Sequence, residues 1–394
     1  MNWLDSWLKA HETELVEFRR DLHAHPELGH QESRTTELLL RRLRAAGLSP
    51  VRLPAGTGVI CDVGPGEPAV ALRADIDALP LPDTKSVPYR STVDGVCHAC
   101  GHDVHTTVAL GAALALAAVP ELPGAVRFVF QPAEEVMPGG ALAVLAAGAL
   151  NGIRQIFALH CDPRQDVGQV GLRTGPITAA ADWLEIAVSG PGGHTSRPHL
   201  TVDTVYALGR LITDLPGLLS RAVDPRSGLS LVWGAVNSGV AFNAIPQTGV
   251  LRGTVRILDS AAWHDAEKLI RRLVAEIVAP TGALAEVDYA RGVPPVVNEV
   301  SATGVLRAGI VGALGECGLA DTPQSMGGED FGWYLEGSPD GAWPGIPGAL
   351  ARLGVYGGGR RPDLHQGSFD VDEGCIPVGV RVFVHTALAA LDGA

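Results

Sequence analysis

The sequence predicts an α/β protein in which a mostly parallel sheet flanked by helices is interrupted by a smaller inserted α+β domain. Short apolar runs typical of buried strands alternate with helical patterns in the first part of the chain. From about residue 179 the strands instead alternate polar and apolar residues, and the first pattern returns after residue 291. We therefore expect one domain made of residues 1–178 and 292–394, interrupted by a second domain of residues 179–291.

The first predicted domain starts with an amphipathic helix at the N-terminus and a second helix over 33–46, which Gly47 ends. Apolar runs then predict strands, and helical stretches separate them. The predicted strands are 58–63, 69–74, 125–131 and 155–159, and the predicted helices are 103–118 and 140–149.

The inserted domain combines four strands with two long helices, a pattern that favours antiparallel strands with both helices on one face. The predicted strands are 182–189, 229–236, 250–258 and 285–290, and the helices are 202–223 and 260–278. After the insertion, helices are predicted over 302–315 and 375–391, with Gly-rich loops between them.

Composition excludes several classes of protein. The chain has 394 residues with 30 Lys plus Arg against 43 Asp plus Glu, a net charge of −13, which argues against a nucleic-acid partner because phosphates need a basic face. No secretory signal and no apolar run long enough to span a bilayer is expected. Six sparse cysteines without a disulfide pattern favour a reduced, cytoplasmic protein.

Metal-binding side chains gather where predicted strands end or a helix begins. Open α/β sheets bind ligands at the carboxyl ends of their strands. The segments are Arg73-Ala-Asp75-Ile-Asp77, Cys97 to His105, Gln131 to Glu135, Leu159 to Pro163 and, in a later loop, Asp363-Leu-His365.

Taken singly, each segment has an ordinary explanation. A lone histidine after a strand is usually a capping or surface residue, and the acids Glu134 and Glu135 suit the first turn of a helix. Cys97 and Cys100 have the spacing of a zinc knuckle or a redox pair, but no second such pair accompanies them. The coincidence of thiol, imidazole and carboxylate groups favours a metal site.

Two adjacent carboxylates suit a divided role. One can bind a metal while the other acts as a base toward metal-bound water, whose pKa falls to about 7; two metals about 3.5–4 Å apart can share a hydroxide and polarise a carbonyl. A positioned general base adds about 10²–10⁴-fold to the rate. Amide hydrolysis is the reaction that uses all of these features.

Segments spread over nearly the whole chain resemble the di-metal aminoacylase and carboxypeptidase family. The resemblance is to its branch of hippurate hydrolases, N-acyl-L-amino-acid amidohydrolases and plant auxin-conjugate hydrolases. HACGHD, PAEE and GGHTSRPH carry it most specifically, with LRADIDALP, LHCDP, FNAIPQ, GTVRIL, MGGEDF and LHQGSFDVDE in support. The resemblance implies metal-dependent hydrolysis of N-acyl amino acids to a carboxylic acid and a free amino acid.

The resemblance also implies a role for each matching residue. Two divalent metal ions per subunit would be bound by Cys100, His102, Glu135, His160 and His365. Glu134 would be the general base, activating the metal-bridging hydroxide and then protonating the leaving amine. The inserted domain would serve as a dimerisation or lid domain, and His194 would reach into the partner's site to stabilise the oxyanion.

Further matches concern the substrate. Asn243 resembles a residue that contacts the substrate carbonyl or carboxylate, and Gly327 and Gly328 are expected to line the pocket. Arg256 is a candidate for binding the α-carboxylate, although a salt bridge within the sheet is an equally good explanation for it.

The chain departs from the broader family at two positions. Arg73-Ala-Asp75 stands where most relatives outside this branch have His-x-Asp, and Cys100 replaces a bridging aspartate. Arg73 cannot bind a cation. Asp75, expected among the catalytic residues, is therefore left either to orient His102 or to pair with an arginine. Cys97 is interpreted as a buried apolar residue or as an extra soft contact.

We therefore expect a cytoplasmic homodimer or dimer of dimers that acts on a small N-acyl amino acid, with no nucleic-acid or membrane partner. A thiolate beside imidazoles favours Zn²⁺ or Co²⁺, and the carboxylates also suit Mn²⁺ and Ni²⁺. The alternatives are deacetylation of a biosynthetic intermediate resembling N-acetyl-diaminopimelate, hydrolysis of a small peptide, or a catalytically silent dimeric binding protein.

Overall fold

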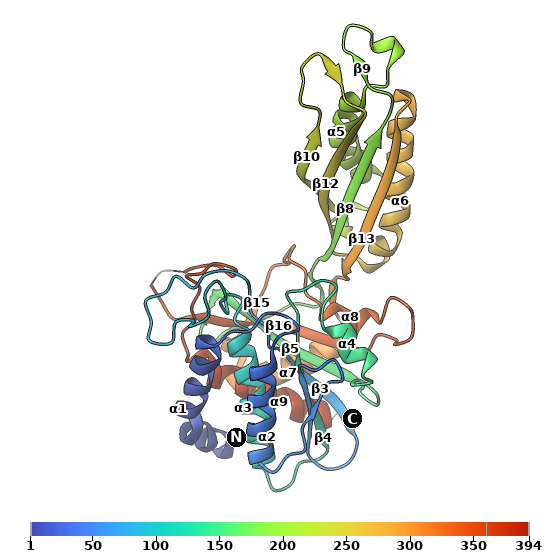
Figure 1. Cartoon of the computed structure of the whole chain (residues 1–394). Coiled ribbons are helices and arrows are strands. Elements are labelled where there is room, and N and C mark those ends of the chain that lie inside the picture. Colours follow the sequence, from blue (N-terminus) through green and yellow to red (C-terminus); the bar gives the residue numbers. More distant parts are fainter. Residues whose placement is uncertain (1, 360, 393–394) are drawn as a thin grey trace. The chain divides into compact units, whose positions relative to one another are not determined.

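The computed structural model describes residues 2–359 and 361–392, and the chain divides into two compact units (Figure 1). The first unit consists of residues 1–175, 298–323 and 333–394, and the second of residues 176–297 and 324–332. The sequence placed the boundaries after residues 178 and 291 and did not assign residues 324–332 to the insertion. That segment joins the second unit because the N–H of Ala179 donates to the carbonyls of Ser325 and Gly327, at 3.0 and 3.2 Å.

The first unit is built on a mixed eight-stranded sheet, in which β3 pairs in parallel with β4 and β5, and β5 with β16. Its strands, in spatial order, are β1 (Val51–Arg52), β2 (Val59–Val63), β4 (Ala125–Gln131), β3 (Pro68–Asp75), β5 (Gln155–Asp166), β16 (Gly348–Tyr356), β6 (Val170–Leu172) and β15 (Leu319–Asp321). This confirms the predicted mostly parallel sheet.

Helices cover the sheet and enclose the main core. They are α1 (Asn2–Ala24), α2 (Ser33–Ala45), α3 (His102–Ala117), α7 (Val300–Leu314) and α9 (Cys375–Asp392), with the short helices α4 (Ala141–Ala146) and α8 (Gly332–Glu336) also present. Alternate residues of β3, Val70, Leu72 and Ala74, belong to this core. Nearly every residue of helix α3 is buried, including the polar residues of its first two turns, so it lies almost entirely inside the protein.

Two differences from the predicted elements affect the site. Strand β5 continues to Asp166, so His160 lies within a strand and not in a loop after it. Strand β16 was not predicted, because Arg352 interrupts its apolar run and glycines lie within it. The two strands pair in parallel, with Arg352 opposite His160.

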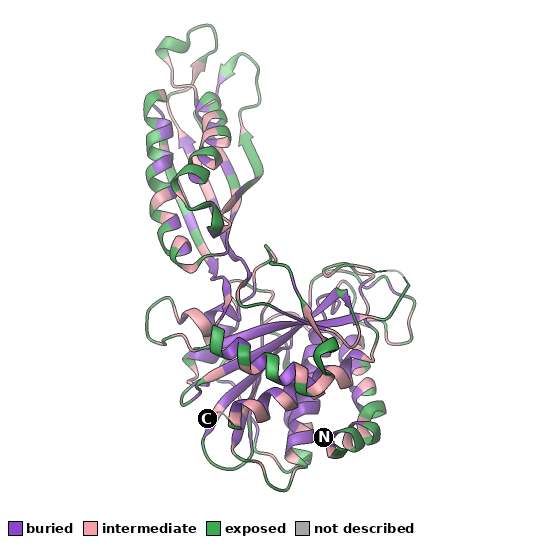
Figure 2. Ribbon diagram, turned by 180° about the vertical axis from the view of Figure 1, so that it is seen from behind, coloured by how far each residue is buried: buried purple, intermediate pink, exposed green. Residues whose placement is uncertain are grey.

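The second unit contains an antiparallel four-stranded sheet with two helices, as predicted. The strands, in spatial order, are β10 (Ser230–Ser238), β12 (Thr248–Ile257), β8 (Ala180–Ser189) and β13 (Leu284–Val293), and the helices are α5 (Thr204–Ala222) and α6 (Ser260–Val278). In β8, Leu184, Ile186 and Val188 are buried while Trp183 is exposed. Both helices bury one side and expose the other (Figure 2). Short pairs complete the fold: β7 (Gly175–Thr178) with β14 (Val296–Asn298), and β9 (Gly193–His194) with β11 (Ala244–Ile245).

Helix α9 is the one helix in the described part of the chain that is long and apolar enough to cross a membrane by length and composition. Its side chains Ile376, Val380 and Phe383 are buried in the core of the first unit. The apolar character of α9 therefore has a structural explanation within this unit.

Candidate metal centre

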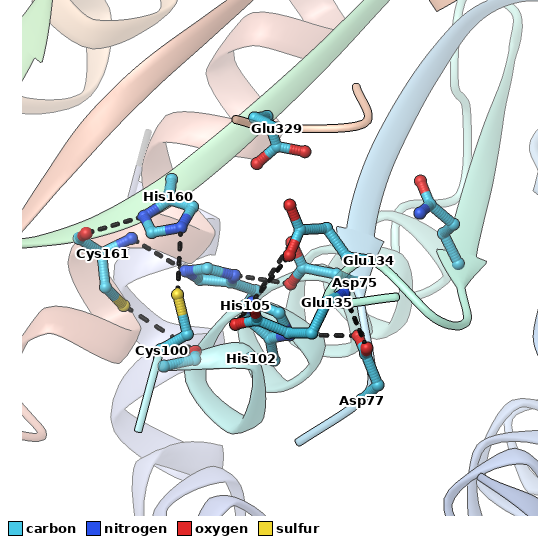
Figure 3. A network of polar contacts seen from close by, with 12 residues as sticks. Asp75, Asp77, Cys100, His102, His105, Glu134, Glu135, His160, Cys161 and Glu329 are labelled. Carbon is cyan, nitrogen blue, oxygen red and sulfur yellow. Dashed lines mark hydrogen bonds and ion pairs between the residues drawn. The ribbon is translucent and has the colours of Figure 1, made fainter. Parts of the chain in front are cut away.

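Parallel pairing of the strands brings the segments with metal-binding side chains close together in the first unit. Asp75 ends β3, Glu134 and Glu135 follow β4, and His160 lies midway along β5, just past the residues of β5 that pair with β3. Because β3 pairs in parallel with both β4 and β5, these positions are neighbours. His102 begins α3 directly beside them (Figure 3).

The structure brings all five predicted metal ligands together. The sulfur of Cys100 lies 3.5 Å from Nε2 of His160, and Nε2 of His365 lies 3.3 Å from Oε1 of Glu135. Nε2 of His102 lies 3.9 Å from the same glutamate oxygen. The groups whose ligand atoms lie within 4.8 Å of one another include Cys100 with His102 and His160, Cys100 with Glu135 and His365, and His102 with Glu134 and Glu135.

The environment of His102 fits a metal ion. Its Nε2 is buried and has no hydrogen-bond partner among the described residues. Carboxylate oxygens of Asp75, Glu134 and Glu135 surround this nitrogen at 3.8–3.9 Å, too far for hydrogen bonds. A buried polar atom without a partner costs about 1–3 kcal/mol, so a cation at this position would satisfy both the nitrogen and the carboxylates. Thiolate, imidazole and carboxylate are also ligands that suit first-row divalent metals.

The charges around the two buried histidines agree with this assignment. Burial acts to lower the pKa of His102, but the carboxylates of Asp75 and Asp77 outweigh it and raise the pKa to about 10. Surroundings that hold a proton on His102 equally favour a metal ion, and binding the metal releases the proton. For His160, burial and the nearby charge of Arg352 keep the pKa well below its usual range. His160 is therefore neutral, the form in which an imidazole binds metals.

The carboxylate that orients His102 is Asp77, not Asp75. Oδ1 of Asp77 lies 3.2 Å from Nδ1 of His102, and Oδ2 accepts the N–H of Glu135 at 2.9 Å. Asp77 is fully buried, so one carboxylate fixes two of the candidate ligands. The sequence showed Asp77 in the same segment as Asp75 but gave no sign of its role.

Asp75 instead takes the second of its two expected roles, pairing with an arginine. Nη1 of Arg73 donates to Asp75 at 2.7 Å, and Nε of Arg73 donates to Gln131 at 2.8 Å. The other oxygen of Asp75 accepts from Nδ1 of His105 at 2.6 Å, and Nε2 of His105 accepts the N–H of Cys161 at 2.8 Å. His105 thus links α3 to β5 behind the site, a role that sequence reasoning missed.

Glu134, the predicted general base, is buried beside this cluster. Its Oε2 lies 3.9 Å from Nε2 of His102, and its side chain points toward the ligand group in Figure 3. Cys97 is fully buried, as its interpretation as a small apolar residue requires, with Nζ of Lys85 at 3.7 Å from its sulfur.

The remaining predicted site residues belong to the second unit. His194 is exposed and its Nδ1 accepts the N–H of Ser196 at 3.1 Å. Arg256 is half-buried in β12, and burial lowers its pKa. Asn243, Gly327 and Gly328 lie in loops of that unit, Asn243 and Gly327 exposed and Gly328 half-buried. The assigned roles of these residues stay predictions.

The sequence pattern of peptidase family M20/M25/M40 matches residues 71–389. The chain belongs to this family. A crystal structure of the Bacillus subtilis YxeP protein, described as a dinuclear metal-binding peptidase from the M20 family, is 35% identical with a TM-score of 0.84, over 98% of this chain and 99% of that one. A putative aminohydrolase from Staphylococcus aureus is 28% identical with a TM-score of 0.90, over 99% of each chain.

Other members of the family are named for amide hydrolysis. N-acetylcysteine deacetylase of Bacillus subtilis is 37% identical over 98% of each chain. IAA-amino acid hydrolase ILR1-like 4 of Arabidopsis thaliana is 34% identical over 95% of this chain and 84% of that protein. The chain spans only 47% of a Rhodococcus jostii protein, named putative glutamate–cysteine ligase 2-3, to which it is 48% identical. This M20 protein is a metal-dependent amidohydrolase, which sets aside the alternative of a silent binding protein.

Proposed function

We propose that this M20 enzyme hydrolyses the amide bond of N-acyl amino acids, releasing a carboxylic acid and a free amino acid. The observation that carries the proposal is the pair Glu134–Glu135 beside a buried cluster of thiol, imidazole and carboxylate groups. In this pair Glu135 faces the ligand atoms of Cys100 and His365, so Glu134 remains available for proton transfer.

The chain's residues divide the reaction between them. Divalent cations held by Cys100, His102, Glu135, His160 and His365 would act as Lewis acids and lower the pKa of water to about 7. Glu134 takes a proton from the attacking water and delivers it to the amide nitrogen as the C–N bond breaks. Asp77 keeps Nε2 of His102 turned toward the cluster by accepting from the opposite nitrogen.

The names of the relatives guide the choice of substrate. Two proteins named for deacetylating N-acetylcysteine are 37% and 38% identical to this chain, and a larger relative is named for joining glutamate and cysteine. We therefore place N-acetyl-L-cysteine first among the candidate substrates, followed by hippurate and indole-3-acetyl amino acids. A single preferred biosynthetic intermediate and a small peptide are the alternatives.

A substrate panel on reconstituted protein tests this proposal. Metal-stripped enzyme is reloaded with Zn²⁺, Mn²⁺, Co²⁺ or Ni²⁺ separately, and release of free amino acid is measured from N-acetyl, benzoyl and indole-3-acetyl amino acids and from dipeptides. We expect turnover of N-acyl amino acids that depends on the added metal. Cleavage confined to dipeptides, or no turnover with metal bound, would contradict the proposal.

We also propose that the enzyme is a homodimer joined through the second unit. Strand β10 is an edge strand, and its side chains Val232 and Val236 are exposed, as are Val240 and Phe242 in the loop after it. A long exposed apolar edge pairs readily with another chain.

All six cysteines are free, which supports a reducing, cytoplasmic compartment.

If His194 acts in the partner's site, two inactive variants should complement each other. In a mixed dimer of Glu134→Gln and His194→Ala subunits, one site has both Glu134 and the partner's His194. Random mixing should then restore about a quarter of wild-type activity, because half of the dimers are mixed and each has one intact site. Mixed dimers verified by mass spectrometry that stay inactive would exclude this role for His194.

A further inference from the structure

The turn that carries the general base begins with a residue in an unfavourable backbone conformation. Ala133, directly before Glu134, has φ +55°. Only three non-glycine residues of the described chain have positive φ, and a second one, His365, is also a candidate ligand. A non-glycine residue rarely adopts this left-handed backbone conformation unless the surrounding structure imposes it, and such residues concentrate at functional sites.

A buried carboxylate from the N-terminal part of the chain holds Ala133 in place. Oε1 of Glu32 accepts the N–H of Ala133 at 2.8 Å, and the Glu32 side chain is fully buried. On the other side of the residue, the N–H of Gly140 donates to the carbonyl of Ala133 at 2.9 Å. Ala133 is thus fixed through both of its backbone polar groups, and the direction of the Glu134 side chain depends on them.

The loop that carries Glu32 packs closely against this turn. A Cβ on Gly29 would lie 3.2 Å from Cα of Ala133 and 2.6 Å from the side chain of Val136. The same loop reaches the segment after β3, where the N–H of Ala78 donates to the carbonyl of Glu27 at 2.8 Å. Residues 27–32 therefore contact both turns that carry the carboxylates of the site. We name this segment the bracing loop.

We propose that Glu32 is a positioning residue for catalysis, which holds Ala133 in its left-handed conformation and thereby aims Glu134 at the substrate. This inference rests on the proposed role of Glu134 as the general base. Glu32 is not one of the five candidate ligands, and its contact with the turn is the hydrogen bond from the Ala133 N–H.

Three variants and a matched control separate positioning from simple stability. Glu32→Ala removes the acceptor for the Ala133 N–H, whereas Glu32→Gln keeps an amide oxygen for it. Ala133→Gly, added to Glu32→Ala, makes positive φ accessible without the acceptor, because glycine adopts it freely. The control is Glu27→Ala, which removes two hydrogen bonds of the same loop, to the N–H groups of Arg34 and Thr35, each at 2.8 Å.

We expect Glu32→Ala to lower kcat about tenfold with KM changed less than about threefold, because a misaimed base slows the chemical step and leaves binding intact. Glu32→Gln should retain wild-type kcat, and the double variant Glu32→Ala with Ala133→Gly should recover part of it. Glu27→Ala should lower Tm as much as Glu32→Ala does, without lowering kcat. Equal kcat losses in Glu27→Ala and Glu32→Ala, or no loss in Glu32→Ala, would overturn the proposal.

Hydrogen exchange gives a readout that needs neither substrate nor metal. In metal-free protein, the peptide that contains Ala133 should exchange faster in Glu32→Ala and at the wild-type rate in Glu32→Gln and Glu27→Ala. If no N-acyl amino acid is turned over, the proposed function fails while this measurement still stands. Unchanged exchange around Ala133 in Glu32→Ala would show that Glu32 does not hold the turn.

Discussion

Replacing Glu134 with glutamine is expected to lower kcat by about 10²–10⁴-fold, the range that a positioned general base contributes. Glutamine has nearly the same shape, so it should fill the same buried position beside His102. It cannot accept the proton of the attacking water or return one to the leaving amine. Metal content, measured by elemental analysis of reconstituted protein, should therefore stay at the wild-type level.

The adjacent carboxylate supplies the control for this experiment. Glu135 faces Cys100 and His365, so Glu135→Gln should lower both metal content and activity. Loss of activity with metal retained in Glu134→Gln, against loss of both in Glu135→Gln, would assign the two roles. Residual activity of Glu134→Gln above about a tenth of wild type would mean that another group carries the proton.

The sequence predicted secondary structure best where a residue pattern is compatible with only one type of element. Apolar runs such as 125–131 and the long helical stretches could be placed because strand and helix periodicities differ. The five candidate ligands could be named because their segments resemble those of a di-metal hydrolase family, and the fold brings those segments together. Strand β16 was missed because a buried arginine and glycines interrupt its pattern.

Contacts between distant segments could not be predicted in the same way. Glu32 meets Ala133 across 101 residues of sequence, and nothing in the local pattern of either segment indicates the other. Asp75 and Asp77 are two residues apart, and only the path of the chain after β3 decides which of them hydrogen-bonds to His102. Residues 324–332 join the second unit through backbone hydrogen bonds, and the side-chain composition of the segment does not indicate such bonds.

The assignment of Asp77 leads to the second large expected effect. Both oxygens of Asp77 accept hydrogen bonds, from Nδ1 of His102 and from the N–H of Glu135. Asparagine has one acceptor, so in Asp77→Asn an NH₂ group would face one of these donors and displace it. Loss of such a partner behind a metal ligand typically weakens metal affinity 10–100-fold, and we expect about that loss here. Competition with a chelator, titrated against metal-free protein, measures it.

Asp75→Asn is the control for the expected loss of metal affinity in Asp77→Asn. Asp75 pairs with Arg73, which is buried, so Asp75→Asn removes a charged partner of a buried arginine and should destabilise the fold by about 3–5 kcal/mol. Its effect on metal affinity should be smaller than that of Asp77→Asn, because no direct hydrogen bond joins Asp75 to a candidate ligand: Nε2 of His102 is 3.8 Å away. Asp77→Asn should thus lower mainly the metal affinity, and Asp75→Asn should lower mainly the free energy of unfolding. A greater loss of metal affinity in Asp75→Asn than in Asp77→Asn would return the orienting role to Asp75, and with it the arrangement expected from the His-x-Asp pattern.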